Sequence, residues 1–395
     1  MREGIAYKSL SVVCTKITDG SHFSPKADEN GSYPMLSVKD MMASGFEYTS
    51  CKYINEHDYK VLVANGCKPK FNDVLVAKDG SYLKTAFVLK EEREQAVLSS
   101  IAIITPRLDE INPDYLAFFF KAPYTKAVVE KHYLTGTAIK RIIIKGFRGI
   151  KIPIPPLSEQ HRIVSELELL SGIIEKKKAQ LKEYDQLAQS IFYDMFGDPI
   201  ENPKGWEVKK LGEVCKKITD GTHDTPQRLE KGVKFITGKH IRPFLVDYDN
   251  SDYVTEEVHK EIFQRCNPEL GDVLYTNIGA GIGNAAINTV EYEFSMKNVA
   301  LLKPLRSIVN GYFLEFYLNN DKIKTIIIDN YSNGGAQKFL SLKSIAKITV
   351  PLPPLSLQQS FAEKIEAIEK QKSLIQQSIA ETQTMFDFTM DKYFG

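Results

Sequence analysis

Apolar residues recur at alternating spacings of four and three in two long stretches of the chain, 158–197 and 356–395. A repeat of 3.5 residues on average keeps one seam of an α-helix facing a partner helix. We therefore expect two helices of about 57 Å each, paired antiparallel as a coiled coil. The alternative is two separate amphipathic helices, each lying on its own domain. Lys177 and Lys372 interrupt the seam and are expected to fix its register at some cost in stability. The other seam positions are Ile163, Leu167, Leu170, Ile174, Leu181, Tyr184, Ala188, Ile191 and Met195, and Phe361, Ile365, Ile368, Ile375, Ile379, Thr382, Phe386, Thr389 and Tyr393.

The whole chain is one unit written twice. Residues 17–22 read ITDGSH and residues 218–223 read ITDGTH. The segment PIPPLS before the first helix returns as PLPPLS before the second. Prolines end a preceding strand or helix, so Ser158 and Ser356 are expected to cap the two helices, with Gln359 completing a capping box in the second repeat.

The rest of each repeat predicts short strands and short helices. Matched turn-and-strand segments lie at 71–76 and 270–275, and an aromatic helix at 114–120 is matched to 311–317. We expect an α+β protein in which two similar mixed α/β domains are separated by the two long antiparallel helices, as a pseudo-twofold dumbbell. The predicted boundaries are 1–157, 158–197, 198–355 and 356–395.

The composition is that of a soluble globular protein, with 43% hydrophobic and 26% charged residues. The chain has no signal-peptide pattern and no apolar run of about 18 residues, which predicts a cytoplasmic protein that does not enter a membrane. The five cysteines form no Cys-x-x-Cys pair, so we interpret them as buried thiols rather than metal ligands or disulfides. A formal charge of +1 means that any contact with nucleic acid comes from local patches or from partners.

Several segments imitate catalytic motifs, and the duplication tests each of them. Residues 279–283 read GAGIG after a strand, but a strand-like segment follows and the other repeat keeps one glycine. A flexible loop is therefore favoured over a nucleotide site. Residues 112–115 (NPDY) resemble the NPPY of adenine methyltransferases, but the other repeat does not share them. The sequence lacks a P-loop, a zinc spacing and a nucleophile elbow. We predict no catalytic residue and no bound metal.

Polar residues at matching loop positions of the two repeats are instead candidates to contact nucleic acid. Lysines and hydroxyls are common phosphate contacts, and Arg, Asn, Gln and Lys read base edges. The competing interpretation for each residue is solvated loop or turn chemistry. The predicted DNA-binding residues are Lys16, Ser21, His22, Lys39, Lys78, Ser81, Tyr82, Lys84, Lys140, Arg141, Lys217, Thr222, His223, Lys239, His240, Arg242, Asn277, Gln337 and Lys338.

Taken in order, these features resemble the specificity (S) subunits of type I restriction–modification enzymes. The resemblance rests on ITDG[S/T]H, a Gly-Asp-Val-Leu-type strand at 271–274, and Pro-x-Pro-Pro-Leu-Ser-x-Gln before a long helix. This set occurs twice and covers the whole chain. Two departures are Asn72, where glycine is usual, and Leu357-Gln358-Gln359, which differs from Ser158-Glu159-Gln160.

The resemblance implies a non-catalytic subunit with two recognition domains. Each domain would read one half of a split sequence in double-stranded DNA, and the helical pair would set the unread gap. The implied partners are two methyltransferase (M) subunits and restriction/translocase (R) subunits. S-adenosylmethionine, ATP and Mg would be bound by those partners, and no cofactor is expected in this chain. The alternatives are a stand-alone DNA methyltransferase or nuclease, and a coiled-coil scaffold without DNA binding.

Overall fold

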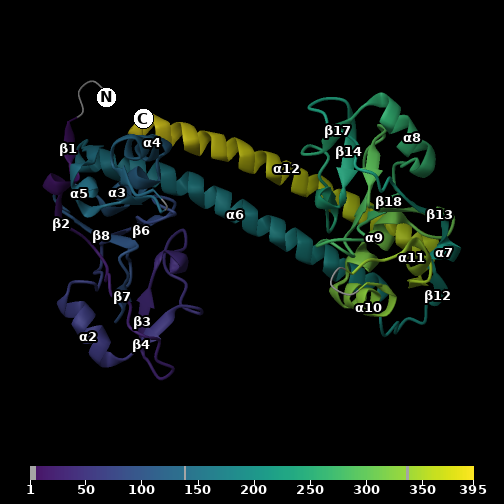
Figure 1. Cartoon of the computed structure of the whole chain (residues 1–395), viewed down its shortest axis with the longest axis horizontal. Helices are drawn as coiled ribbons and strands as arrows, with labels where there is room; N and C mark the ends of the chain where they lie inside the picture. Colours follow the sequence, from purple (N-terminus) through teal and green to yellow (C-terminus); the bar gives the residue numbers. More distant parts are fainter. Residues whose placement is uncertain (1–5, 138, 335–337) are drawn as a thin grey trace. The chain divides into compact units, whose positions relative to one another are not determined.

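The computed structural model describes residues 6–137, 139–334 and 338–395 and divides the chain into two compact units. Unit 1 consists of Met1–Lys178 with Gln377–Gly395, and unit 2 is Ala179–Gln376. Two helices of 40 residues each, α6 (Leu157–Phe196) and α12 (Leu355–Phe394), pass from one unit into the other. Every other described element belongs to one unit, and each unit mixes helices with short strands (Figure 1). The α+β prediction is confirmed.

Unit 1 holds a four-stranded antiparallel sheet in the order β2-β8-β5-β6 and a three-stranded sheet in the order β4-β3-β7. Helix α3 packs on the first sheet, and α2 lies beside β7 of the second. The strands are β1 (Tyr7–Ser9), β2 (Cys14–Asp19), β3 (Tyr33–Leu36), β4 (Lys52–Ile54), β5 (Val74–Ala77), β6 (Ala86–Val88), β7 (Ala96–Val97), β8 (Ile101–Pro106), β9 (Leu134–Thr135), β10 (Arg141–Ile142) and β11 (Lys151–Pro153). The helices are α1 (Leu10–Val13), η1 (Val38–Asp40), α2 (Glu56–Ala64), α3 (Pro113–Lys121), α4 (Pro123–His132) and α5 (Ile144–Gly149).

Unit 2 repeats this arrangement, with sheets in the orders β13-β21-β18-β19 and β17-β14-β20. Helices α9 and α8 take the places of α3 and α2. The strands are β12 (Glu207–Lys210), β13 (Cys215–Asp220), β14 (Val233–Thr237), β15 (Ile241–Arg242), β16 (Leu245–Val246), β17 (Asp252–Val254), β18 (Val273–Tyr275), β19 (Ala285–Ile287), β20 (Ser295–Lys297), β21 (Ala300–Pro304) and β22 (Thr349–Leu352). The helices are α7 (Leu211–Val214), η2 (Gly238–His240), α8 (Glu256–Cys266), α9 (Gly311–Asn319), α10 (Asp321–Tyr331) and α11 (Leu342–Ile345).

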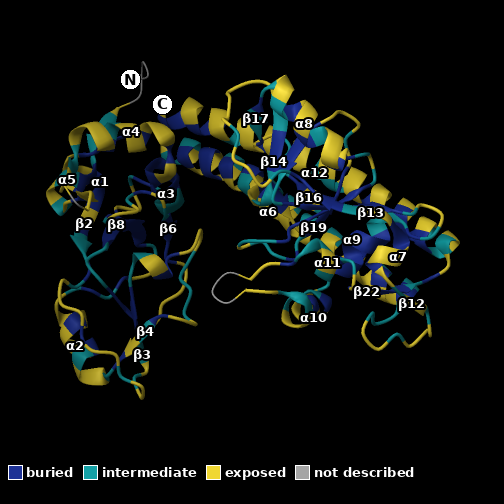
Figure 2. Ribbon diagram, turned by 45° about the vertical axis from the view of Figure 1, so that its right-hand side comes forward, coloured by how far each residue is buried: buried dark blue, intermediate teal, exposed yellow. Residues whose placement is uncertain are grey.

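In each unit the core continues from the larger sheet into both long helices (Figure 2). Unit 1 buries Phe394, near the end of α12, with its ring centroid 5.1 Å from that of Tyr115 on α3. Unit 2 buries Phe196, at the end of α6, at 4.8 Å from Phe313 of α9 and 5.2 Å from Phe361 of α12. The start of one long helix therefore lies beside the end of the other in each unit, which confirms the predicted antiparallel pairing.

The two lysines of the predicted seam make contacts between the helices. The Lys177 ammonium donates to the hydroxyl of Ser378 and, at 3.3 Å, to that of Thr382. Lys372 pairs with Asp185 of α6 at 2.8 Å and with Glu369 of its own helix. Because burial of an ammonium is unfavourable without partners, these contacts disfavour sliding of one helix along the other. The role in fixing register stays a prediction.

The beginning of each long helix differs from the expectation. The helices begin at Leu157 and Leu355, one residue before each serine, and the predicted capping role of the serines is wrong. The cause is the preceding proline, because the carbonyl of Pro156 already accepts from the N–H groups of Glu159 and Gln160. Residues 157–160 therefore enter the helix directly from the proline turn.

A fully buried glutamine in the first turn ties each long helix to its unit. The Gln358 amide accepts from the N–H of Asn310 at 2.8 Å and donates to the carbonyls of Ile308 at 3.1 Å and Pro353 at 2.8 Å. Gln160 makes the equivalent three bonds in unit 1. Gln358 is thus the counterpart of Gln160. The difference expected between residues 357–359 and residues 158–160 arises from an alignment of the two repeats that is shifted by one residue.

The aromatic helices also match in a different register from the predicted one. Asn112 caps α3 and Asn310 caps α9, so the offset between the helices is 198. Glu315, a buried carboxyl on α9, is then the counterpart of Ala117. Its Oε1 accepts from the N–H of Ile287 at 2.9 Å. A repeated aromatic pattern fits both registers, and the cap distinguishes them.

Replacing Gln358 with leucine should destabilise unit 2. The variant leaves a buried N–H and two carbonyls without their partner, and each such group costs about 1–3 kcal/mol. We expect the free energy of unfolding to fall by about 3 kcal/mol in urea denaturation followed by the fluorescence of Trp206, the single tryptophan. Gln359→Leu, at the exposed neighbouring position, should change it by less than about 0.5 kcal/mol. Equal effects of the two variants would contradict the anchoring role.

Unit 2 should lose stability as the pH rises through neutrality. Burial raises the pKa of Glu315 from its ordinary 4.5 to about 8, against the lowering effect of the Ile287 N–H. Between these two pKa values the unfolded chain releases a proton that the folded chain retains. The contribution of Glu315 to stability is therefore fully present below about pH 4.5 and is lost progressively as the pH rises to about 8. Glu315→Gln should flatten this dependence in Trp206-monitored unfolding, and Glu366→Gln, at an exposed site, should not.

Candidate nucleic-acid interface

In both units the loops that follow the strands of the larger sheet meet the end of the smaller sheet. In unit 1 the segment after β2 pairs with the segment after β7 through Ser21 and Leu98. In unit 2 Thr222 and Lys297 form the same parallel bridge. The predicted hydroxyl and imidazole positions of both repeats therefore occupy the same structural place.

In both units the aspartate of the shared ITDG segment lies against an exposed histidine. In unit 2 Asp220, whose side chain is 6% exposed, lies 3.0 Å from Nε2 of His223, whose side chain is 61% exposed. In unit 1 the distance from Asp19 to His22 is 3.3 Å. A second cation compensates each carboxylate. In unit 1 this cation is Lys78, which lies 3.3 Å from Asp19. In unit 2 it is Arg265 of α8.

The compensating cations come from different elements in the two units. Arg265, at the end of α8, donates to Asp220 at 2.5 Å. Its counterpart region in unit 1 has no arginine, and Lys78 from the loop after β5 takes over this role. In unit 2 the position of Lys78 is occupied by Asn277, which donates to the carbonyl of Leu340 at 3.3 Å.

The glycine of the ITDG segment is required by close packing rather than by an unusual backbone angle. A Cβ on Gly221 would lie 1.9 Å from the carbonyl oxygen of Met296, and a Cβ on Gly20 would lie 2.0 Å from that of Val97. The following residues, Ser21 and Thr222, donate their N–H groups to these same carbonyls. The Asp-Gly pair is thus structural, and it places the histidine two residues later.

The structure distributes the other predicted contact residues between surface and interior. Lys16 and Lys217 are exposed, and each donates to a carbonyl at the end of a helix, Gly66 at 3.1 Å and Arg265 at 2.6 Å. Tyr82 donates to Glu130 at 2.9 Å. The exposed candidates are Lys39, Ser81, Lys84, Lys140, Arg141, Lys239, Arg242 and Lys338, the buried ones are Lys78, His240 and Asn277, and Gln337 lies outside the described residues.

A Ser–His–Glu arrangement in unit 2, with a buried serine and a buried histidine, resembles a catalytic triad but serves the fold. His259 of α8 lies 3.0 Å from the hydroxyl of Ser295 and 3.0 Å from the carboxylate of Glu293. Ser295 is fully buried, so a substrate has no access to its hydroxyl. In unit 1 Tyr59 of α2 donates to Glu94 at 2.5 Å in the same place. Both contacts fasten a helix to the smaller sheet.

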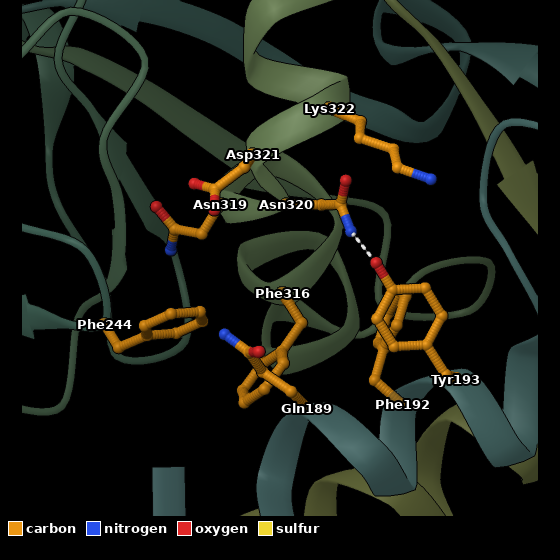
Figure 3. A pocket seen from close by; sticks show the side chains of 9 residues that line it. All are labelled: Gln189, Phe192, Tyr193, Phe244, Phe316, Asn319, Asn320, Asp321 and Lys322. Carbon is orange, nitrogen blue, oxygen red and sulfur yellow. Dashed lines mark hydrogen bonds between the residues drawn. The ribbon is translucent and has the colours of Figure 1, made fainter. Parts of the chain in front are cut away.

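A cavity of about 200 Å³ lies between the end of α6 and the junction of α9 with α10 in unit 2 (Figure 3). Phe192, Phe244 and Phe316 form its aromatic wall. Two asparagines on its rim already have partners, because Asn320 donates to Tyr193 at 2.6 Å and Asn319 bonds the backbone of β19. Its polar groups thus support the packing of the long helix.

The described residues contain no cluster of His, Cys, Asp and Glu that could hold a metal ion. Among the same residues, no helix is both long enough and apolar enough to span a membrane.

Sequence reasoning missed two cations near the interface, Arg228 and Lys297. Lys297 ends β20, where unit 1 has Leu98. Because this counterpart is apolar, comparison of the two repeats gave no signal for Lys297. Its polar character at the end of an apolar strand is a signal that could have identified it.

Comparison with known proteins gives a consistent result. Two copies of the type I restriction modification DNA specificity domain match residues 3–183 and 203–383. The chain is 24% identical over 371 residues to the type I restriction enzyme MjaIX specificity subunit of Methanocaldococcus jannaschii, covering 86% of this chain and 83% of that protein. It is 20% identical over 382 residues to the EcoBI specificity subunit of Escherichia coli, covering 89% and 77%.

The fold is likewise similar to that of a solved protein. The crystal structure of a type I restriction–modification S subunit from M. genitalium matches 100% of this chain and 98% of its own, with a TM-score of 0.61 and 16% sequence identity.

The Gly221→Ala variant tests the close packing behind the exposed histidine. The added methyl group cannot fit 1.9 Å from the Met296 carbonyl, so β13 and β20 must separate. We expect the free energy of unfolding to fall by more than about 2 kcal/mol in Trp206-monitored denaturation. At Gly238 a Cβ meets its nearest neighbour at 3.4 Å, and Gly238→Ala should have an effect below about 0.5 kcal/mol. A Gly221→Ala protein as stable as the wild type would contradict this packing.

Proposed function

This chain belongs to the family of type I restriction–modification DNA specificity proteins, and from this premise we propose that its two units each read one half of a bipartite DNA target. The chain is the non-catalytic specificity subunit of such a system. The methyl transfer, ATP-driven translocation and cleavage then belong to partner subunits that bind S-adenosylmethionine, ATP and Mg. Two methyltransferase subunits and the restriction subunits are the partners that this assignment requires.

The observation that carries the proposal is the repetition of one exposed loop cluster in both units. Each unit holds an exposed histidine against an aspartate, His22 on Asp19 and His223 on Asp220. Exposed lysines at equivalent positions of the two 3-10 turns, Lys39 and Lys239, accompany them. Side chains of this kind bind phosphates and base edges. Two similar surfaces on one chain suit a target with two separate halves.

The paired helices are proposed to set the distance between the half-sites. A helix of 40 residues is about 60 Å long at 1.5 Å per residue, which corresponds to at most about 17 base pairs of 3.4 Å. Two readers on the same side of a duplex lie about 10 base pairs apart. We assign reading to 1–157 and 198–355, and spacing to 158–197 and 356–395.

The exchange of one recognition domain tests the division of labour. Residues 1–157 are replaced by the corresponding domain of another specificity subunit, and the chimaera is assembled with its methyltransferase subunits. Mapping of methylated adenines should show that one half of the target changes while the other half and the gap stay the same. A change in both halves, or methylation by this chain without partners, would refute the proposal.

A further inference from the structure

A hollow of about 390 Å³ opens among the loop ends of unit 2. The 3-10 turn at Gly238 and Lys239, the glycine-rich loop after β18, and Lys297 at the end of β20 form its walls. At the equivalent positions unit 1 has Val38 and Leu98 in place of Gly238 and Lys297. Unit 2 thus has no side chain at the first of these positions and a cation at the second.

The charge around the hollow is positive. Arg228, Lys239 and Lys297 line it. Asp252 neutralises part of this charge, because it lies 2.7 Å from Arg228 and 3.0 Å from Lys239. Lys297 donates only to the neutral hydroxyl of Thr225 and has no acidic partner among the described residues. Three cations against one carboxylate leave an excess of positive charge for an anionic ligand.

The backbone of the glycine-rich loop adds donors to this charge. The N–H groups of Gly279, Ala280 and Gly281 donate to no other described residue. Gly279 has a φ of +92°, in the left-handed region. Consecutive unpaired N–H groups around a left-handed residue form a concave anion-binding surface. The same loop that fails as a dinucleotide fingerprint can therefore hold a single phosphate group.

We propose that this hollow is a phosphate-binding site, and that its occupant in the working complex is one phosphodiester of the DNA backbone. The second half of this statement rests on the proposed function, and the phosphate chemistry does not. The site belongs to unit 2, since unit 1 has Leu98 at the position of Lys297. The two recognition surfaces are therefore unequal, and the second has an additional anchor to the DNA backbone that carries no sequence information.

The first experiment uses inorganic phosphate and the full chain. Backbone amide resonances of Gly279, Ala280 and Gly281 should shift saturably with phosphate. Lys297→Leu introduces the residue of unit 1 and should weaken binding at least about tenfold, because one charge-assisted contact is lost. Gly238→Val fills the hollow without changing its charge and should weaken binding by exclusion of the anion. Lys126→Leu, at an exposed lysine of α4 in unit 1 that is not among the predicted DNA-binding residues, is the matched control and should leave binding unchanged.

Two outcomes of this experiment would overturn the phosphate site. One is the absence of a saturable shift. The other is an effect of Lys297→Leu without one of Gly238→Val, because the anion would then bind at the surface rather than in the hollow. The second variant also guards against misfolding of the first.

The second experiment identifies the source of the phosphate. A series of DNA duplexes is prepared, each with a neutral methylphosphonate at a different single linkage. The binding of each duplex to the complex of this chain with its methyltransferase subunits is measured. One linkage in the half-site read by unit 2 should weaken the wild type about tenfold and should not weaken Lys297→Leu further. If no linkage behaves in this way, the phosphodiester assignment is wrong. If the wild-type complex shows no sequence preference at all while inorganic phosphate still binds, the proposed function fails and the site binds a free phosphate compound instead.

Discussion

The rest of the structure depends on one buried amide at the start of each long helix. Gln160 and Gln358 each join three backbone groups from two segments that are far apart in the sequence. Apolar contacts alone tolerate sliding, because they are non-directional. Three hydrogen bonds to a single planar group are directional, and they fix how the helix leaves the proline turn. The proposed spacing role of the helices requires this kind of junction, because movement there would change the distance that the helices set.

The duplication shows which constraints the fold imposes and which it leaves open. The aspartate of the ITDG segment is kept in both units, but its cation is Lys78 in one and Arg265 in the other. The contact between the smaller sheet and the helix beside it is Tyr59–Glu94 for α2 in unit 1 and His259–Glu293 for α8 in unit 2. A buried charge or polar group needs a partner, and several chain positions can supply one. The loops can therefore diverge without loss of the scaffold.

The sequence predicted the elements that depend on a repeating pattern. The heptads identified α6 and α12, and the duplication identified two similar units. Prediction from the sequence failed where a single tertiary contact determines the local structure. The serine caps were wrong because the carbonyl of Pro156 already serves the first turn. The register of α9 was one residue off because an aromatic run fits two alignments. Among the candidate contacts, burial of Lys78, His240 and Asn277 depends on neighbours from distant segments, and a one-dimensional pattern does not contain those neighbours.

The formal charge of the chain is only +1, and its ion pairs decide which cations remain for contact with nucleic acid. Part of its basic side chains compensates buried carboxylates, as Lys303 does for Asp272 at 2.5 Å and Arg265 for Asp220. Those cations are not available to phosphates, whereas exposed ones such as Lys39 and Lys84 are. Affinity for DNA grows with the number of phosphates neutralised, so each cation held in an internal ion pair contributes less to that affinity. On the proposed function, partner subunits would supply the remaining electrostatic attraction to DNA.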